Sequence, residues 1–427
     1  MAERKPFDVV ILGATGFTGR QAVRALGRRG GALKWTVAGR DAARLAALGA
    51  PAEPIVADTG DVASLDALAA KTRVLVNFAG PYAPSGEAVV VACIAQGTHY
   101  LDLSGETFWV REMIARHHRA AQRAGVKVMP TAGYESLPFD LAVLWGATRL
   151  AQRHGAPCRE LKIVVSVTGT RSLKPADAVS GGTVASLRSM LEYDTSDCVR
   201  NPACLMPDPG SAEAAAAARR NAIDFVPRFD ADVQAVVAPT LPAPFVNPPM
   251  VLRSVALLDD PSLFAPEFAY REATNMAVLV PRFEFMPHAA TLPLQWAAAA
   301  SLAAPLANLS AAIAGPLQFQ RGALDKLVQW LAPRPGQGPS DKALDGMGFA
   351  FDVIASATNG AVWRGRVEGD GHPGYRAAAE MIVAAACGLA DGSLGKTPHA
   401  GVVTPATGLG LEAVAAMASA GVRFVEG

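Results

Sequence analysis

A short apolar run followed by three closely spaced glycines constrains this chain more than any other feature. Residues 7–12 read FDVVIL, which predicts a strand buried on both faces, as in a parallel sheet. GATGFTG follows at 13–19, and residues 20–29 continue with helical spacing. A strand, a glycine turn and a helix in this order are typical of a dinucleotide-binding unit, in which the helix N-terminus faces the phosphates.

Each glycine of this turn has its own task in such a unit. Gly13 allows the tight turn, Gly16 lets the pyrophosphate approach the backbone, and Gly19 lets the helix pack close to the strand. The spacing is GxxGxxG rather than GxGxxG, and glycines also make ordinary turns, so the flanking strand and helix carry the prediction. We therefore expect a dinucleotide to contact Gly13, Thr15, Gly16, Phe17, Thr18 and Gly19.

The same alternation of strands and helices continues to about residue 150. Further short apolar segments, separated by segments of helical spacing, predict a six-stranded doubly wound parallel sheet. After the first strand, the others are expected at 34–38, 54–57, 73–78, 98–103 and 126–129. The predicted fold class is therefore α/β, with a Rossmann-type doubly wound parallel sheet.

Ligands of such sheets bind beyond the carboxyl ends of the strands, which singles out the residues that follow each strand. Arg40 follows the second strand, where NAD-preferring enzymes usually carry an acid. It therefore favours a 2′-phosphate and NADP(H), although Asp41 is adjacent. A turn or a helix cap is the alternative role for each of the remaining candidates. They are Asp58, Thr59, Asn77, Ala79, Gly80, Ser104 and Gly105.

Several longer motifs occur in a fixed order along nearly the whole chain. They include AGR at 38–40, NFAGPY at 77–82, THYLDLSGE at 98–106, GYESLPFD at 133–140, SGGT at 180–183, FAYRE at 268–272, PRPGQGPS at 333–340, HPGY at 372–375 and GVVTPATGLG at 401–410. Together with GATGFTG, this set resembles the saccharopine dehydrogenase-like oxidoreductases, and most closely their trans-acting enoyl reductase branch. The resemblance implies a Rossmann domain with an inserted α+β domain, NADP(H), and hydride transfer to an α,β-unsaturated polyketide or lipid-type substrate, often delivered by a carrier.

The segment after the sixth strand departs from the family pattern. Relatives commonly read Cys-Gly-Phe-Asp-Ser, whereas this chain has AGYES at 132–136. Ala132 offers no thiol, which excludes a Cys-based mechanism at that position, and the Asp-to-Glu change leaves the substrate open. We expect Tyr134, Tyr82 and Glu135 to be the catalytic residues, with Tyr134, Tyr82 or water as the proton source. No tyrosine is followed four positions later by lysine, which excludes the mechanism of the short-chain dehydrogenases.

Composition narrows the class further. The formal net charge of +1 over 427 residues gives no pull toward nucleic acid. The five cysteines form no CxxC pair, so we expect no metal, no disulfide framework and a reducing compartment. The adjacent pair His117 and His118 is expected at the surface rather than at a metal. The polar N-terminus shows no signal peptide, which predicts a cytoplasmic protein.

The chain is expected to divide into three parts. Residues 1–153 form an NADP-binding Rossmann domain, and 154–370 form a substrate and dimerisation domain of the α+β type. By resemblance, the C-terminal helices of 371–427 return to the Rossmann domain. In the second part, 251–257 and 274–280 are strand-like, and 349–357 with 361–367 predicts a hairpin.

An apolar segment without Asp, Glu, Lys or Arg runs from 289 to 320. Three prolines interrupt it, so we expect two short helices that form an apolar flap. Peripheral membrane or lipid-groove contact, a buried or homodimer-forming helix, and a full membrane span are the open alternatives.

The sequence thus predicts an NADPH-dependent oxidoreductase, an enoyl reductase by resemblance, acting on a small-molecule or carrier-bound acyl substrate. One alternative is a membrane-associated protein that binds NADP(H) without turnover. Another is imine reduction of the saccharopine type, whose substrate carries several carboxylates and needs clustered arginines. Arg171, Arg188, Arg253 and Arg271 form no evident cluster in the sequence.

Overall fold

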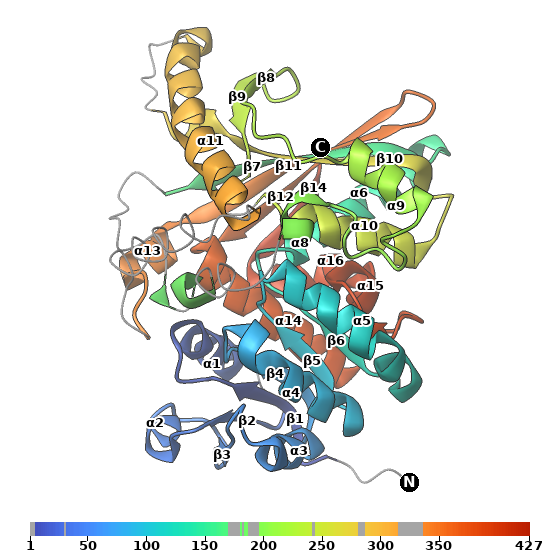
Figure 1. Ribbon diagram of the computed structural model, residues 1–427. Coiled ribbons are helices and arrows are strands. Elements are labelled where there is room, and N and C mark those ends of the chain that lie inside the picture. Colours follow the sequence, from blue (N-terminus) through green and yellow to red (C-terminus); the bar gives the residue numbers. More distant parts are fainter. Residues whose placement is uncertain are drawn as a thin grey trace.

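A computed structural model describes residues 5–29, 31–169, 180–181, 183–186, 196–240, 244–280, 287–314 and 336–427. Two seven-stranded sheets organise these residues. The first sheet and its helices occupy the lower part of Figure 1, and the second sheet lies above them. Arg171, Arg188 and the end of the apolar segment at 315–320 lie outside the described residues.

The first sheet is parallel throughout, in the order β13-β6-β5-β4-β1-β2-β3. This order confirms the predicted Rossmann-type doubly wound sheet, but the sheet has seven strands where six are expected, because the C-terminal part of the chain adds β13. The strands at its centre are almost fully buried because helices cover both faces. The bounds are β1 Phe7–Leu12, β2 Trp35–Gly39, β3 Ile55–Val56, β4 Thr72–Asn77, β5 His99–Asp102, β6 Lys127–Met129 and β13 Gly401–Val402.

The helices of this half follow the predicted alternation, with one clear difference. The helical spacing of the sequence predicts a start at Glu87, but helix α4 begins at Tyr82, because the Glu106 carboxylate accepts hydrogen bonds from the backbone N–H groups of Tyr82 and Ala83. An acid far along the chain therefore caps this helix, which local sequence cannot reveal. The bounds are α1 Phe17–Arg29, α2 Ala42–Ala46, α3 Val62–Ala70, α4 Tyr82–Ala95 and α5 Thr107–Ala124.

The second sheet is mixed, in the order β14-β12-β11-β7-β10-β9-β8. Only the β10–β7 pair is parallel; the remaining pairs are antiparallel. β11 and β12 form the predicted hairpin. The bounds are β7 Cys158–Thr168, β8 Arg228–Asp230, β9 Ala235–Ala238, β10 Phe264–Asn275, β11 Gly348–Ala357, β12 Val362–Asp370 and β14 Val422–Glu426.

Helices between the sheets join the two halves. Helix α6, Leu137–His154, packs on β7, β11 and β12, whereas α14, Ala378–Asp391, packs on β1, β4 and β5. The C-terminal part of the chain contributes β13 to the first sheet and β14 to the second. The other elements are α8 Ser196–Arg200, α9 Ala212–Arg220, η3 Met276–Val278, η4 His288–Thr291, α13 Asp341–Gly346, the π-helical turn η5 Pro373–Ala377, α15 Pro405–Leu409, α16 Glu412–Ala416 and η6 Met417–Ala420.

Two strand predictions in the second half are wrong. The apolar run at 251–257 lies in α10, Asn247–Leu258, whose prolines fit the first helical turn. Met250 to Ser254 are all buried, and a helix apolar on every side cannot be distinguished from a buried strand by periodicity. At 274–280, β10 ends at Asn275 and the short helix η3 follows.

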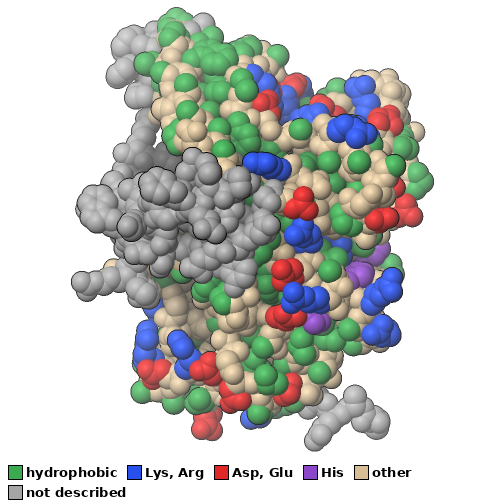
Figure 2. Space-filling model, viewed as in Figure 1, with side chains coloured by type: hydrophobic (Ala, Val, Ile, Leu, Met, Phe, Trp, Pro, Cys, Tyr) green, Lys and Arg blue, Asp and Glu red, His purple; other side chains and the backbone are tan. Residues whose placement is uncertain are grey.

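Within the described part of the apolar segment, residues 289–314, one helix, α11 Leu292–Ala314, runs through Pro305, where a break between two short helices is expected. It projects at the upper left of Figure 1, and Figure 2 shows hydrophobic side chains gathered over it. Leu294 is 52% exposed and Trp296 43% exposed. Within the described residues, no helix combines the length and apolar character needed to cross a membrane.

Candidate active site

The glycine turn sits between β1 and α1, at the carboxyl edge of the first sheet. Gly13 has a φ of +77°, and a Cβ there would lie 2.7 Å from the backbone N of Ala79. A Cβ at Gly19 would lie 2.4 Å from the Gly13 carbonyl oxygen. Both positions therefore require glycine: the first lets the turn approach the end of β4, and the second lets α1 pack on the turn.

The same turn presents the N-terminus of α1, which carries no acidic residue in its first turn. The Arg20 guanidinium folds back and donates to the Thr15 carbonyl oxygen over 2.7 Å, which places a positive charge beside the turn. Thr15, Gly16, Phe17 and Thr18 are each partly exposed at this end of the helix. Free N–H groups, a helix dipole and a nearby cation fit the pyrophosphate of a dinucleotide.

Arg40 directly follows β2, whose Ala38 is the register partner of Leu12 on β1. Its side chain is exposed and has no ion-pair partner among the described residues. The Asp41 carboxylate accepts a hydrogen bond from Arg44 N over 3.0 Å and caps α2. The adjacent acid therefore has a structural task, and the cation fits a 2′-phosphate at this strand end.

The residues after β3 serve the backbone. Asp58 Oδ1 accepts from the N–H of Gly60 over 2.9 Å, and the N-cap of α3 is Asp61. The Asp58 carboxylate therefore stabilises the turn that precedes α3. Thr59, the next residue, is half-buried. Contact of Asp58 and Thr59 with the cofactor stays a prediction.

A buried polar network joins the ends of β4 and β5. Asn77 Nδ2 donates to Tyr100 Oη over 3.1 Å, and Tyr100 Oη donates to Asp102 Oδ2 over 2.8 Å. Asp102 Oδ1 accepts from the backbone N–H groups of Ser104 and Thr131. Burial raises the pKa of Asp102 to about 7 despite these bonds. The network fixes the backbone of the turns that the sequence places at the cofactor.

The small residues of these turns line the same edge. Ala79 N donates to Asn77 Oδ1 over 2.9 Å, and Gly80 is exposed and precedes a cis peptide bond to Pro81. Ser104 Oγ accepts from Glu106 N over 3.1 Å. A Cβ at Gly105 would meet no heavy atom of the described residues within 4 Å, which leaves room for a ligand on this side of the edge.

The two candidate tyrosines lie in different surroundings. Tyr82 Oη donates to the Asn77 carbonyl oxygen over 3.1 Å and accepts from Leu103 N over 3.3 Å. Both bonds are internal, which gives Tyr82 a structural role. Tyr134 packs edge-on against Phe349 at 4.9 Å between ring centroids. Among the described residues its hydroxyl makes no hydrogen bond, so that hydroxyl is available to a ligand.

The charges around Tyr134 keep its hydroxyl protonated. Burial raises the pKa of Tyr134 well above its usual range, and the negative charges of Glu272 and Glu135 raise it further. Burial also raises the pKa of Glu135 to about 7, and its Oε2 is buried with no hydrogen bond. Both groups can therefore hold a proton near neutral pH.

The structure brings two further motifs to this edge, to which the sequence assigns no catalytic role. The Tyr375 ring of the HPGY motif packs edge-on against Phe17 at 5.3 Å. Its hydroxyl accepts from Ser180 N over 2.5 Å and lies 2.9 Å from Thr183 Oγ1, both of the SGGT motif. The negative charge of Glu135 also raises the pKa of Tyr375. Both motifs are visible in the sequence, but only the fold shows that they meet.

The histidine pair serves helix α5. His117 Nε2 lies 2.7 Å from Glu87 Oε1, and His118 Nδ1 accepts from Val402 N over 3.1 Å. Both side chains are half-buried rather than at the open surface. Across the described ranges, no three His, Cys, Asp or Glu side chains gather in a way that could hold a metal ion.

Comparison with known proteins adds independent information. The family model described as the saccharopine dehydrogenase NADP binding domain matches residues 9–129. The chain is 30% identical to a Mycobacterium tuberculosis protein provisionally named a trans-acting enoyl reductase, with 99% of this chain and 98% of that protein covered. It is 29% identical to the trans-acting enoyl reductase of Mycobacterium bovis, covering 99% and 97%. The solved structure of apo saccharopine dehydrogenase (L-Glu forming) from Saccharomyces cerevisiae aligns over 98% of this chain and 99% of that chain. The TM-score is 0.48 and the sequence identity 15%, and a likeness of this size supports no conclusion.

Proposed function

Because this chain belongs to the saccharopine dehydrogenase-like oxidoreductases, in their trans-acting enoyl reductase branch, we propose that it reduces the C=C bond of an α,β-unsaturated polyketide or lipid-type substrate. The chain is an NADP-dependent oxidoreductase, since its first 129 residues carry the NADP-binding domain. The observation that carries the finer proposal is the similarity to enoyl reductases over 99% of the chain. It includes the second sheet as well as the cofactor half.

Bound NADPH supplies the hydride that the β-carbon of the conjugated substrate receives. The glycine turn and the N-terminus of α1 hold the pyrophosphate, and Arg40 holds the 2′-phosphate. The network of Asn77, Tyr100 and Asp102 fixes the turns after β4 and β5, so that their backbone presents one rigid edge. These residues orient the reacting groups rather than taking part in the bond changes.

The α-carbon of the substrate then needs a proton. Tyr134 is the first candidate, because its raised pKa keeps the hydroxyl protonated and no internal hydrogen bond occupies it. Glu135 is the second, because a carboxyl with a pKa of about 7 is partly protonated at neutral pH. Tyr82 is less favoured, since its hydroxyl bonds the backbone.

Helix α11 supports an apolar or carrier-bound substrate. It contains no Asp, Glu, Lys or Arg, and Trp296 and Leu294 are exposed on it. A segment of this kind suits the acyl chain of a lipid-type substrate or a peripheral contact with a membrane surface. Cosedimentation with phosphatidylcholine vesicles checks the membrane part. If the chain and its Trp296→Ser variant bind the vesicles equally, the proposed membrane contact of α11 is wrong.

A direct assay tests the proposed reaction. The purified chain is mixed with NADPH and a 2-enoyl thioester of N-acetylcysteamine, which imitates a carrier-bound acyl group. The expected product is the saturated thioester. A 2-oxo acid offered with an amine is the matched comparison for imine reduction. If the chain reduces the imine formed from the 2-oxo acid and the amine, but not the enoyl thioester, the proposed substrate class is wrong and imine reduction takes its place.

A further inference from the structure

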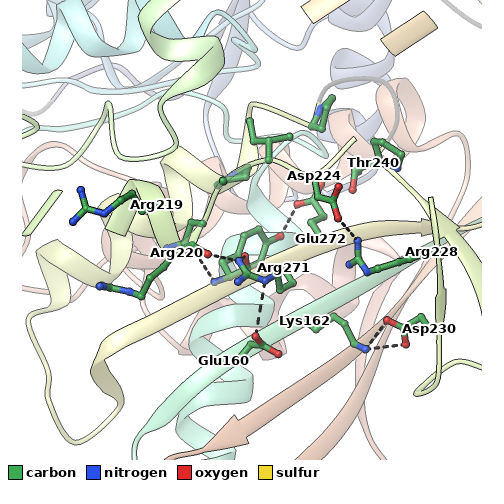
Figure 3. Close-up of a pocket in the computed structure, with 17 residues that line it drawn as sticks. Glu160, Lys162, Arg219, Arg220, Asp224, Arg228, Asp230, Thr240, Arg271 and Glu272 are labelled. Carbon is green, nitrogen blue, oxygen red and sulfur yellow. Dashed lines mark hydrogen bonds and ion pairs between the residues drawn. The ribbon is translucent and has the colours of Figure 1, made fainter. Parts of the chain in front are cut away.

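A cavity of about 490 Å³ lies at the side of β10 in the second sheet (Figure 3). β10 pairs with β9 only at Thr274 and Asn275, so the preceding part of this strand edge is free. Residues 221–224, which follow α9, line the space together with Pro239, Thr240 and Pro244. All lining residues fall between Glu160 and Glu272, and none belongs to the first sheet. The cavity is therefore distinct from the cofactor-binding edge of the first sheet, although the charge of its Glu272 acts on Tyr134.

Two buried polar groups, Thr240 and Glu272, line the inner side of this cavity, and Asn247 lies close to Glu272. The side chains of Thr240 and Asn247 are 4% and 3% exposed. Thr240 Oγ1, Asn247 Oδ1 and Glu272 Oε1 are each buried without a hydrogen bond of ordinary geometry. Thr240 and Asn247 lie close enough to Glu272 to lower its pKa, yet none of these three atoms has a well-directed partner. Buried polar atoms in folded proteins are almost always bonded, so this inner side is incomplete without a ligand.

The carboxyl group at the centre of this inner side can both donate and accept. Tyr270 Oη donates to Glu272 Oε2 over 2.5 Å, which leaves Oε1 facing Thr240. Burial raises the pKa of Glu272 to about 7, so the neutral and ionised forms are both present near neutral pH. Either form accepts a hydrogen bond from a hydroxyl or an amide N–H group.

The outer side of the cavity carries guanidinium groups that lack a carboxylate partner. Arg219 is exposed, and Arg220 Nη2 donates only to the Pro266 carbonyl oxygen, over 3.0 Å. The Arg220 Nε is buried without a hydrogen bond. In the part of the chain that the structure describes, neither arginine forms a salt bridge, and Figure 3 shows both on one side of the pocket. Arg271 is engaged instead: its Nε lies 3.9 Å from Glu160 Oε2, and its Nη1 donates to the Arg220 carbonyl oxygen over 2.6 Å.

The remaining cations of the lining are neutralised within the protein. Lys162 Nζ lies 2.6 Å from Asp230 Oδ2, and Arg228 Nη1 lies 3.0 Å from Asp224 Oδ2. These pairs are drawn as dashed contacts in Figure 3. The unpaired charge is thus confined to the side that carries Arg219 and Arg220. Guanidinium groups there match the geometry of a carboxylate or a phosphate.

We propose that this cavity binds a small organic anion, a carboxylate or a phosphate, that also carries a hydroxyl or amide N–H group. The anionic group faces Arg219 and Arg220, and the hydroxyl or amide donates to Glu272 and Thr240. Two sources share this chemistry: a free hydroxy acid, and a phosphate-bearing arm such as that of an acyl carrier. The proposal does not depend on the enoyl reductase activity, because no residue proposed to bind the cofactor or to donate the proton lines the cavity, and Glu272 acts on Tyr134 only through its charge.

Isothermal titration calorimetry on the full chain tests this site with three probes. 4′-Phosphopantetheine carries a phosphate, a hydroxyl and amides; citrate carries carboxylates and a hydroxyl; inorganic phosphate carries charge alone. We expect saturable binding of phosphopantetheine or citrate, and whichever binds more tightly identifies the source. Inorganic phosphate should bind at least about tenfold more weakly than the tighter probe, because it offers nothing to the inner side.

Matched variants assign the binding to this cavity. Arg219→Ala should weaken the tighter probe about tenfold, and the isosteric Thr240→Val should weaken it about fivefold. Arg123→Ala, which removes an exposed arginine of α5 far along the chain from this cavity, should leave binding unchanged. No saturable binding of either organic probe overturns the proposal. An equal loss with Arg123→Ala, or inorganic phosphate binding as tightly as the organic probes, also overturns it.

Discussion

The carboxyl edge of the first sheet and the cavity of the second sheet each bury a carboxyl group whose pKa is about 7, yet they treat it differently. Asp102 accepts from Tyr100, Ser104 and Thr131, so both of its oxygens are bonded within the protein. Glu272 has one oxygen bonded to Tyr270 and the other buried without a directed partner. A completed network of this kind holds a backbone in place, whereas an incomplete one has capacity left for a ligand.

The largest expected effect concerns chemistry at the first sheet. Tyr134→Phe should lower kcat about 100-fold or more, because general acid catalysis contributes at least that factor. Steady-state kinetics across pH measure this effect. The packing on Phe349 remains in the variant, and no hydrogen bond to a described residue is lost. The free energy of unfolding should therefore change by less than about 0.5 kcal/mol. Unchanged turnover at every pH would remove Tyr134 as the acid and leave Glu135 or water.

The second effect compares hydroxyl deletions in the two regions. Tyr100→Phe leaves Asn77 Nδ2 and Asp102 Oδ2 without their buried partner, so the free energy of unfolding should fall by about 2 kcal/mol. Thr240→Val removes a buried hydroxyl that has no directed bond, so the change should stay within about 0.5 kcal/mol or be stabilising. Urea denaturation measures both. Equal losses would show that the two networks do not differ.

The third effect sharpens the cofactor side of the comparison. Arg40→Ala should raise the KM for NADPH about tenfold, since an exposed guanidinium–phosphate contact is lost, and should leave the KM for NADH unchanged. Coenzyme titrations with both nucleotides measure the ratio. Arg123→Ala is the control for a general loss of positive charge. A parallel rise for NADPH and NADH in Arg40→Ala would contradict the assignment of Arg40 to the 2′-phosphate.

The smallest effect concerns pH. The pKa of Glu272 is raised from the ordinary 4.5 to about 7, so the folded state holds its proton more tightly than the unfolded state. This contribution to stability is complete below about pH 4.5 and is lost as the pH rises through about 7. Glu272→Gln abolishes it, so the stability of the variant relative to the parent should rise by about 0.8 kcal/mol between pH 6.5 and pH 8. Urea denaturation at both pH values measures the difference. A constant difference would mean that this carboxyl is not strained by burial.

Local sequence predicts the first sheet well because each of its signals is local. The apolar run of β1, the glycine at position 13 and the helical spacing of α1 lie within one short segment, and each demands its own conformation. The start of α4 could not be predicted, because its cap comes from Glu106 in the next βα unit. The prediction that Arg40 follows β2 depended only on the end of one strand.

The second half resisted prediction for the opposite reason. An apolar run such as 251–257 is compatible with a buried strand or a buried helix, and only packing on all sides decides in favour of α10. The cavity is built from α9, β7, β8, β10 and the adjoining segments, so no single stretch contains its pattern. Arg219 and Arg220 look like an ordinary basic helix end until the fold places Glu272 and Thr240 opposite them.

One measurement tests the central claim most directly, namely that the carboxyl edge of the first sheet reduces a conjugated double bond. NADPH carrying deuterium at the transferred position of C4 is incubated with the chain and a 2-enoyl thioester, and the product is analysed by mass spectrometry and NMR. We expect a saturated thioester with one deuterium at the β-carbon, and a sharply reduced yield with Tyr134→Phe. Tight NADPH binding without deuterium transfer to any enoyl thioester would contradict it.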